Sequence, residues 1–521
     1  MYLKLNLIKN ISKITFTDLL SILPEIYLIL MCLCALILIS MANFTPSSTK
    51  LQKKLEIMPT IYDYSINVLW YTICLLLLQY INIKPILSFT NYTINDMYTT
   101  TIKIVIILTI ILIMRASENS FTKHPRHLIE YPILLLLTTI FLLFLISSFN
   151  FITMFLAILG FSLTLYVLLL NDSFNHASRE AGIKYFYLSS VSSSLMICGI
   201  FLIYLIFHTT SFMAITWLLA NWKNYHNLDY NAFLFTVMLY FLIFGFFFKL
   251  AAFPCHLWAP EVYDGSPNAM TVFLVLPIKI ATFALFLRIL GNTFGDLYQY
   301  WHYILWMSSL FSMLWGCLGA ISEKLIKRFM AYSSINQMGF LLMGLTSGTF
   351  EGFRATLIFL LLYIIMNAGF FLIYLTTKEK TTNKSLTYLT DFNDFAQKNY
   401  LYSFGLVIIL FSMAGIPPLG GFFGKYFIFL HSFETGHIGL VIIGMITSVI
   451  GTYYYLRIIK IMWFEKPIEI RFEFETLLSP NLQTTYNIIQ FSLIWFILWT
   501  PWLFKYMNIL TSVGIHPLNW C

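Results

Sequence analysis

Long apolar runs separated by short polar segments dominate this chain. A run of about 17 to 25 apolar residues is long enough to cross a bilayer as a helix. We predict fourteen such spans, near residues 19–42, 64–83, 100–115, 131–149, 151–170, 184–208, 230–254, 267–291, 299–320, 329–346, 353–376, 401–430, 436–463 and 484–504. The pattern therefore indicates an all-α polytopic membrane protein.

The composition agrees with this prediction. Of the 521 residues, 59% are hydrophobic and 10% are charged, whereas soluble domains carry about 25% charged residues. The seven cysteines form no CxxC pair and no Cys/His ligand spacing, so neither an iron–sulfur nor a zinc site is indicated. The opening segment lacks a small-residue cleavage site, which favours a first helix over a removable signal.

The basic residues are distributed unevenly between the two faces of the predicted bundle. Of the 31 Lys and Arg residues, 19 follow odd-numbered helices and nine, including Lys103 and Arg288, fall on the face with both termini. Loops rich in Lys and Arg stay on the inner side of a membrane. We therefore predict both termini on the outer face, meaning the intermembrane space or the periplasm, and we expect no nucleic-acid partner.

The order of the spans predicts an internal repeat. Spans four to eight cover residues 131–291, and spans nine to thirteen cover residues 299–463. Five is an odd number, so the two blocks enter the membrane from opposite sides, as in the inverted repeats of many transporters. Residues 1–130 then carry the first three helices, and residues 464–521 carry a loop and the last helix.

The seventh and twelfth spans occupy corresponding positions in the two repeats, and both contain helix-breaking residues. Lys249 precedes Pro254 in the seventh span, and Lys425 follows the segment AGIPPLGGFFG in the twelfth. Proline removes a backbone donor and clashes with the preceding turn. We predict that both spans break inside the membrane, which favours a hydrated cavity there; a proline kink in a packed helix is the alternative.

Three lysines, Lys249, Lys279 and Lys425, lie within apolar runs. An ammonium at the bilayer centre costs roughly 2.5 to 3.5 kcal/mol, so such residues usually serve a charge or proton pathway. Lysine suits a proton relay because its pKa falls readily when the side chain is desolvated. We predict a line of three lysines across the bundle, linked by water and small polar groups. Snorkelling or pairing for packing alone is the alternative.

Three further residues are candidates for the same pathway. His256 falls on the same helical face as Lys249 if the helix continues, and it would then join the relay; a structural role is the alternative. Lys184 begins the sixth span and either ends the line or marks the basic face. Carboxylates are scarce in the apolar runs, and Glu25 is the clearest; a contact with the dipole of the first helical turn would explain it.

Four segments of the chain resemble the proton-conducting membrane subunits of respiratory complex I, most closely the subunit N family, called subunit 2 in mitochondria. They are FGFFFKLAAFPCHLWAPEVYDGSPNAMTVFL, PIKIATFALFLRIL, IKRFMAYSSINQMGFLLMG and AGIPPLGGFFGKYFIF. The resemblance implies an antiporter-like fold that takes part in proton translocation driven by NADH oxidation and ubiquinone reduction elsewhere in the complex. It implies that partner subunits bind NADH, FMN, iron–sulfur clusters and ubiquinone, and that this chain binds no cofactor.

The resemblance also assigns individual residues. The family's lysines of the sixth, seventh, eighth and twelfth helices fall on Lys184, Lys249, Lys279 and Lys425. The family's fifth-helix glutamate, which normally pairs with a lysine, falls on Leu159, and Gln337 stands where many members have His. Either a carboxylate from another helix or subunit substitutes for this glutamate, or the chain has a structural role without pumping.

The resemblance implies that the partners are other membrane-arm subunits of complex I, especially neighbouring antiporter-like subunits, together with membrane lipids. A cation/proton antiporter subunit or a membrane-bound hydrogenase subunit shares the fold and is an alternative. Phe, Tyr, Ile and Asn are abundant, as in proteins from AT-rich organellar genomes. We therefore expect the mitochondrial inner membrane rather than a bacterial plasma membrane.

Overall fold

The computed structural model describes most of the chain. The described residues are 16–43, 50–80, 85–118, 130–171, 175–225, 232–379, 385–393, 395–465, 474–476 and 478–515. The opening segment before Phe16 and Cys521 lie outside them. So do several of the basic residues used to predict the orientation, namely Lys4, Lys9, Lys13, Lys84, Lys123, Arg126, Lys380, Lys384, Lys466 and Arg471.

The first half of the chain forms helices and one short hairpin. Its elements are α2 (Phe16–Ser21), α3 (Leu23–Asn43), α4 (Lys50–Tyr80), β1 (Ile86–Ser88), β2 (Thr93–Asn95), α5 (Met97–Ser117), α6 (Glu130–Ser147), α7 (Phe151–Leu170), α8 (His176–Phe207), α9 (Phe212–Tyr225), α10 (Ala232–Leu250), α11 (Trp258–Gly265), α12 (Asn268–Val275) and α13 (Pro277–Arg288). β1 and β2 pair antiparallel, with Ile86 opposite Asn95.

The second half is also mainly helical. Its elements are the π-helical turn η4 (Ile289–Thr293), the 3₁₀ turn η5 (Gly295–Leu297), α14 (Tyr298–Ser322), α15 (Ile326–Thr346), α16 (Phe350–Thr376), β3 (Thr377–Glu379), the 3₁₀ turn η6 (Leu389–Phe392), α17 (Phe395–Lys398), α18 (Tyr400–Ala414), α19 (Gly420–Glu434), α20 (Ile438–Trp463), β4 (Phe474–Thr476), α21 (Pro480–Ile494) and α22 (Phe496–Ile515). β3 and β4 pair antiparallel, with Thr377 opposite Thr476.

Each of the fourteen predicted runs lies on a helix or on a pair of helices, so the all-α polytopic prediction is confirmed. Among the described residues, ten helices are long and apolar enough to cross a membrane, and the bent pair α21–α22 makes up to eleven. The other three runs fail that test for physical reasons. The apolar part of α3 is short, α18 and α19 are separate half-length helices, and α15 carries a row of polar side chains.

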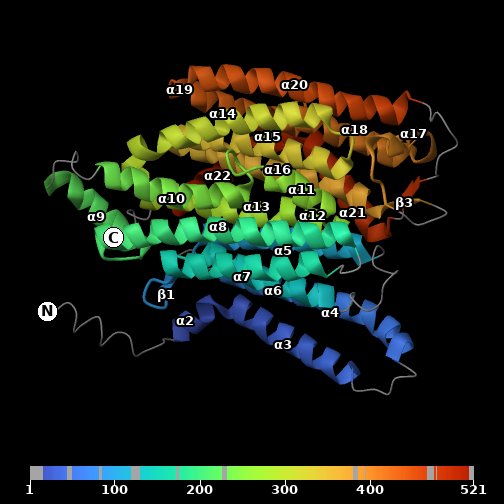
Figure 1. The fold of residues 1–521 in the computed structure, drawn as a ribbon, viewed down its shortest axis with the longest axis horizontal. Helices are drawn as coiled ribbons and strands as arrows, with labels where there is room; N and C mark the ends of the chain where they lie inside the picture. Colours follow the sequence, from blue (N-terminus) through green and yellow to red (C-terminus); the bar gives the residue numbers. More distant parts are fainter. Residues whose placement is uncertain are drawn as a thin grey trace.

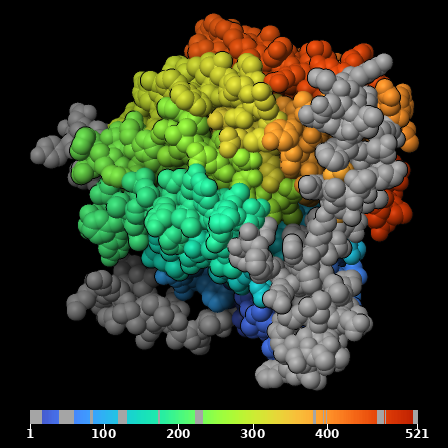
Figure 2. Space-filling model, turned by 45° about the vertical axis from the view of Figure 1, so that its right-hand side comes forward, coloured from blue at the N-terminus to red at the C-terminus, as the bar shows by residue number. Residues whose placement is uncertain are grey.

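The helices are stacked roughly in sequence order (Figures 1 and 2). α3 lies at one edge of the bundle, α20 lies at the opposite edge, and α8 crosses between them. The core of the bundle is formed by α13, α15 and α16, whose residues are almost all buried. All twelve residues of α13 are buried, so the polar groups of this helix must find partners inside the protein.

The first and the last described segments lie at the same end of the bundle, which we call the terminal end. The contacts that hold this end together are a hydrogen bond from the Phe89 N–H to Asp18, the bridges Thr93–Ser148 and Asn150–Ser211, and a hydrogen bond from the Asn292 amide to the Gly514 carbonyl. A chain that begins and ends on one side crosses the membrane an even number of times. This agrees with the predicted number of spans.

The seventh predicted span is broken near its end. α10 ends at Leu250, four residues before Pro254. The ring of a proline clashes with the carbonyl four residues earlier and the proline nitrogen donates no hydrogen bond, so the helix cannot extend past Leu250. Ala251 follows with a φ of 56°, and the chain runs without helix until α11.

The twelfth predicted span is broken as expected. α18 ends at Ala414, and Gly415 follows with a φ of 87°. Glycine adopts this left-handed conformation without strain and commonly ends helices. Pro417 and Pro418 cannot continue a helix, and α19 begins at Gly420.

A third break, which the sequence analysis did not predict, divides the eighth span. α12 ends at Val275 and α13 begins at Pro277. Proline is well suited to the first position of a helix, but it leaves the carbonyl of Phe273 without its helical donor. Lys279 therefore lies in the first turn of a new helix, beside a break.

The structure corrects the placement of two charges. Lys103 and Arg288, which we assigned to the outer face, lie in α5 and α13 with exposed fractions of 0% and 1%. The assignment to a loop was wrong because each residue lies inside an apolar helix and is paired with a carboxylate. The division of the chain into residues 1–130, 131–291, 299–463 and 464–521 stays a prediction.

The packing of α14 on α15 generates a testable prediction. A Cβ on Gly316 would lie 2.5 Å from the backbone nitrogen of Asn336, and backbone cannot move aside as a side chain can. Such overpacking typically costs about 1–3 kcal/mol, so Gly316→Ala should lower the amount of assembled protein in membranes on a native gel. Gly439→Ala is the control because nothing lies within 4 Å of the added Cβ. Equal amounts of the two variants would contradict the predicted close packing.

Candidate functional site

Lys425 is held by the end of another helix. Its Nζ donates hydrogen bonds to the carbonyl oxygens of Met413, at 3.0 Å, and Ala414, at 2.9 Å. These carbonyls have no donor within α18 because the helix ends at Gly415. The carbonyl end of a helix favours a positive charge, so the break in the twelfth span supplies the acceptors that this buried ammonium needs.

Lys279 is fully buried in the first turn of α13. Its Nζ donates a hydrogen bond to the Ser334 hydroxyl on α15 at 2.9 Å. The same Nζ lies 5.9 Å from the centre of the Tyr263 ring. The partner groups of this lysine are therefore hydroxyl-bearing side chains, which can both donate and accept a hydrogen bond.

Lys249 has quite different surroundings in the last turn of α10. Its side chain is 3% exposed, and its Nζ forms no hydrogen bond with any described residue. Instead it lies 5.2 Å, 5.7 Å and 5.6 Å from the ring centres of Phe161, Tyr185 and Phe248. Aromatic faces attract a cation, but they do not replace the hydrogen bonds that an ammonium makes in water.

α15 contacts two of the three lysines. Ser334 accepts the hydrogen bond from Lys279, and the ring centre of Phe340 lies 5.3 Å from the Nζ of Lys425. Six residues correspond to about 9 Å along a helix. Gln337 lies three residues from each of them, so it neighbours both on the helix surface. Lys279 and Lys425 therefore meet the same helix less than two turns apart, with Gln337 between the two contacts.

Buried amides and hydroxyls surround the middle of this face. Gln337, the residue that the sequence analysis noted, accepts a hydrogen bond from the Asn367 amide at 3.1 Å and donates one to the Tyr455 hydroxyl at 3.5 Å. The Tyr363 hydroxyl donates to the Val275 carbonyl at 2.9 Å, next to the break before Lys279. The predicted small polar groups are thus present between the eighth and twelfth spans.

The connection between Lys249 and Lys279 is aromatic. The ring of Trp258 lies 5.6 Å from that of Tyr185 and 6.1 Å from that of Tyr263, and these two tyrosines face the two lysines. The Tyr263 hydroxyl is buried and lies beside the Ser334 hydroxyl, the group that accepts from Lys279. Two phenol groups, rather than amides, therefore stand between the seventh and eighth spans.

Two sequence-predicted residues lie apart from this arrangement. Lys184 is a surface residue of α8 with an exposed fraction of 41%, and it pairs with Glu180 at 2.8 Å and Glu261 at 2.7 Å. His256 lies in the non-helical segment after α10, against the rings of Phe253 and Trp315. Our argument that helical spacing places His256 beside Lys249 is wrong, because α10 ends between them.

The structure describes no carboxylate paired with Lys249, Lys279 or Lys425. Leu159, which occupies the position expected for a glutamate, is a partly buried residue of α7. The roles of Lys184, Lys249, Lys279, Lys425 and His256 in proton transfer stay predictions at this point.

Comparison with known proteins decides the family. The model of the NADH:quinone oxidoreductase/Mrp antiporter membrane family matches residues 148–451. The chain belongs to this family. It is 38% identical over 340 residues to NADH-quinone oxidoreductase subunit N of Paramagnetospirillum magneticum, which covers 65% of this chain and 69% of the relative. It is 37% identical over 390 residues to the subunit N of Granulibacter bethesdensis, with coverage of 74% and 80%.

Solved structures of family members share the fold. A chain of respiratory complex I from Thermus thermophilus matches 93% of this chain with a TM-score of 0.75 and 22% identity, and 99% of that chain is covered. A chain of the Mrp complex from Dietzia sp. DQ12-45-1b matches 96% of this chain with a TM-score of 0.78 and 18% identity, and 98% of that chain is covered. The antiporter-like fold that the resemblance implied is confirmed.

The structure also shows two buried ion pairs that the sequence analysis missed, both involving residues before the stretch that the family model matches. Lys103 pairs with Glu25 at 2.5 Å, and Arg288 pairs with Asp96 at 2.5 Å. The signal was present in the sequence, since Lys103 and Arg288 lie inside apolar runs that we predicted to span. What the sequence did not show was which carboxylate each residue meets.

The pair Asp96–Arg288 generates a prediction. Asp96→Asn keeps the cap of α5, where the Asp96 side chain accepts from the Thr99 N–H, because Asn caps helices as well as Asp does. It leaves Arg288 buried without a counter-charge, which typically costs about 3–5 kcal/mol. The assembled protein should therefore lose its fold at a lower temperature in a thermal-shift measurement.

Asp63→Asn is the control for this experiment. It breaks the exposed pair Asp63–Arg115, whose atoms are 3.4 Å apart, and exposed pairs contribute about 0–1 kcal/mol. If both variants unfolded at the wild-type temperature, the buried pair would be irrelevant to stability.

Proposed function

We propose that the chain is a membrane-arm subunit of respiratory complex I and takes part in moving protons across the membrane. NADH oxidation and ubiquinone reduction in partner subunits would drive this movement. The chain would then be an enzyme only as part of the NADH:ubiquinone reductase. The relatives named NADH-quinone oxidoreductase subunit N support this proposal.

One observation about the site carries the proposal. Lys249, Lys279 and Lys425 are buried in the bundle, and each lies at or beside a break in its span. Burying three ammonium groups for packing alone is costly, since each costs roughly 2.5 to 3.5 kcal/mol at membrane depth. A lysine that takes up and releases protons is charged only part of the time. Burying such lysines is therefore reasonable in a chain that transfers protons.

The residues around the lysines suggest how a proton would move. From Lys279, the Ser334 hydroxyl can accept one proton while it donates another, and the amide of Gln337 can orient water toward the carbonyl-held Lys425. Between Lys249 and Lys279, we propose that water joins the two tyrosine hydroxyls, because Nζ of Lys249 and the hydroxyl of Tyr263 are buried polar groups that need partners.

The proposal extends to cofactors, partners and location. NADH, FMN, iron–sulfur clusters and ubiquinone would be bound by other subunits, with none in this chain. Neighbouring antiporter-like subunits and membrane lipids would cover the apolar outer faces. We propose the mitochondrial inner membrane, with both termini toward the intermembrane space, although the curated relatives named above are bacterial. Protease digestion of a terminal tag in intact and opened mitochondria tests both points.

A structural subunit that does not pump is the second candidate. Leu159 replaces the glutamate expected in the fifth helix, and rings rather than a carboxylate surround Lys249. The fold would then serve to build the membrane arm. Counting protons moved per electron in the intact complex separates this candidate from the first, and the subunits that copurify would show an antiporter or hydrogenase complex instead.

Removing either of two buried lysines should stop proton transfer through this chain. Lys249→Met and Lys279→Met keep the apolar stem and remove the titrating amine, so the pumping rate of the assembled complex should fall by roughly tenfold or more. The redox spectra of the iron–sulfur clusters should stay unchanged. Lys460→Met is the control, since Lys460 is an exposed residue paired with Glu465. Normal pumping by both buried-lysine variants would favour the structural role.

A further inference from the structure

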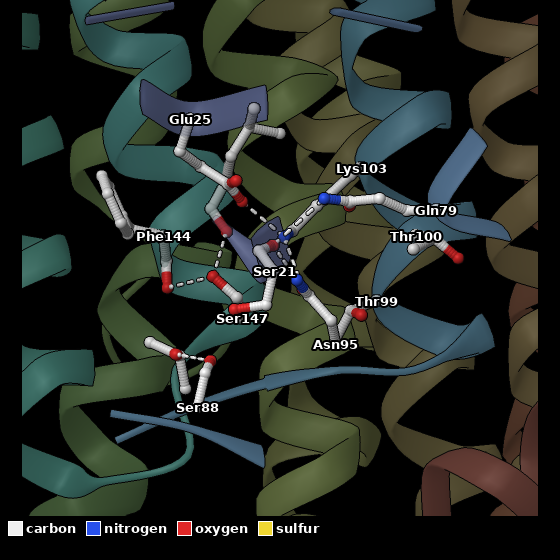
Figure 3. A network of polar contacts seen from close by, with 12 residues as sticks. Ser21, Glu25, Gln79, Ser88, Asn95, Thr99, Thr100, Lys103, Phe144 and Ser147 are labelled. Carbon is white, nitrogen blue, oxygen red and sulfur yellow. Dashed lines mark hydrogen bonds and ion pairs between the residues drawn. The ribbon is translucent and has the colours of Figure 1, made fainter. Parts of the chain in front are cut away.

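A buried ionisable cluster lies apart from the line of lysines, between α3, β2 and α5 (Figure 3). Nζ of Lys103 donates to Glu25 Oε1 at 2.5 Å and to Asn95 Oδ1 at 3.0 Å. The Asn95 amide in turn donates to the Ser21 carbonyl. Lys103 and Glu25 are 0% and 1% exposed, so this is a fully desolvated pair of opposite charges.

The backbone of Lys103 lies at the depth of the central lysines, whereas its ammonium reaches back toward the terminal end, to Asn95, the neighbour of Asp96. Arg288 pairs with Asp96, and the Tyr98 hydroxyl donates to the Ala284 carbonyl at 2.7 Å, so α5 and α13 run antiparallel from the terminal end. Seven residues separate Asp96 from Lys103 on α5, which is about 10 Å along the axis. Nine residues separate Arg288 from Lys279 on α13, about 13 Å. The Cα atoms of Lys103 and Lys279 are therefore at similar depths on neighbouring helices, while the Lys103 ammonium lies nearer the terminal end.

The cluster has unsatisfied acceptors. Glu25 Oε2 and Gln79 Oε1 are buried and have no hydrogen-bond partner among the described residues, while the Gln79 amide nitrogen donates to the Leu20 carbonyl at 2.8 Å. Removing both charges of an ion pair from water is repaid only when further hydrogen bonds satisfy the remaining lone pairs. Two free acceptors need donors, and the available donors are water or a proton on the carboxyl group itself.

A pocket connects this cluster to the terminal end. It has a volume of about 410 Å³ and is lined by leucines of α2, α3 and α4, by Tyr80, Ile86 and Met97, and by the polar residues Thr17, Ser21, Gln79, Asn95, Asp96 and Thr100. Ser21 and Asn95 thus border the pocket on one side and belong to the cluster on the other. A water molecule occupies about 30 Å³, so the pocket has room for several.

We propose that Glu25 and Lys103 form a second proton-exchanging site, which water in this pocket connects to the terminal end of the bundle. A hydronium ion in the pocket transfers its proton to the Glu25 carboxylate and becomes water; the ion pair opens, and the Lys103 ammonium stays on Asn95 Oδ1. The reverse step returns the proton to water and closes the pair. This site would provide the buried lysine–carboxylate pair that Leu159 removes from the fifth helix, a role that rests on the proposed function.

Infrared difference spectroscopy of the purified complex tests the first step. A carboxyl group that gains a proton shows a C=O stretching band, and Glu25→Gln should remove one such band from the difference between acidic and alkaline samples. Glu351→Gln is the control, because Glu351 is 57% exposed: this variant should lose only the band of a solvated carboxyl group and leave the Glu25 band in place. If Glu25→Gln removes no band, Glu25 is permanently ionised and the proposal is overturned.

A pair of tryptophan variants tests the pocket without touching either charge. Leu75 lines the pocket, whereas Leu77 is a 50% exposed residue of the same helix. Leu75→Trp should fill the pocket and slow proton exchange at Glu25 by roughly tenfold, measured as the decay of the Glu25 band after a pH jump. Leu77→Trp should leave the rate unchanged. Equal rates in both variants would rule out this pocket as the route.

The outcomes also separate this proposal from the proposed function. If Glu25→Gln removes a band while Lys249→Met and Lys279→Met pump normally, the second site is kept and the central line of lysines is rejected. If Glu25→Gln removes no band while the two lysine variants pump poorly, the line of lysines is kept and the second site is rejected.

Discussion

The positive charge of a buried lysine is the constraint on which this structure depends. Inside a bundle of apolar helices, an ammonium needs acceptors, and the regular hydrogen bonding of a helix leaves none free. Breaking a span provides them, as the carbonyls of Met413 and Ala414 do for Lys425. The prolines and glycines of the twelfth span therefore do more than bend it, because they create the binding site of a charge in the middle of the membrane.

The three lysines are not equivalent. Lys425 is held by two carbonyls, Lys279 by one hydroxyl, and Lys249 by aromatic rings alone. Because the three surroundings differ, the free energy of placing a proton on each lysine should differ too. Neighbouring charges can then change which lysine is protonated. α15 contacts two of these lysines through Ser334 and Phe340 and carries the buried amide of Gln337 between them, so in the proposed pathway this helix would link the eighth and twelfth spans.

The buried ion pairs connect the amino-terminal helices to the helix that carries Lys279. Asp96–Arg288 fastens α5 to α13, the helix that carries Lys279, and Glu25–Lys103 fastens α3 to α5. Charges on adjacent helices of the bundle are separated by protein rather than water, so they influence one another more strongly than surface charges do.

The sequence by itself determined the class of the protein, the position of nearly every span and the three central lysines. These features follow from local chemistry, since an apolar run must be a helix in lipid and a charge within it is costly wherever the helix goes. Pro254 and the glycines near Lys425 likewise act on their own neighbours, so the breaks in the seventh and twelfth spans could be predicted. Only the tertiary structure decided which groups meet: Lys103 with Glu25, Arg288 with Asp96, Lys279 with Ser334. Lys184 is a surface residue, and His256 lies against the rings of Phe253 and Trp315. Contacts between helices depend on how the helices rotate and pack, and the sequence of a single helix does not encode this.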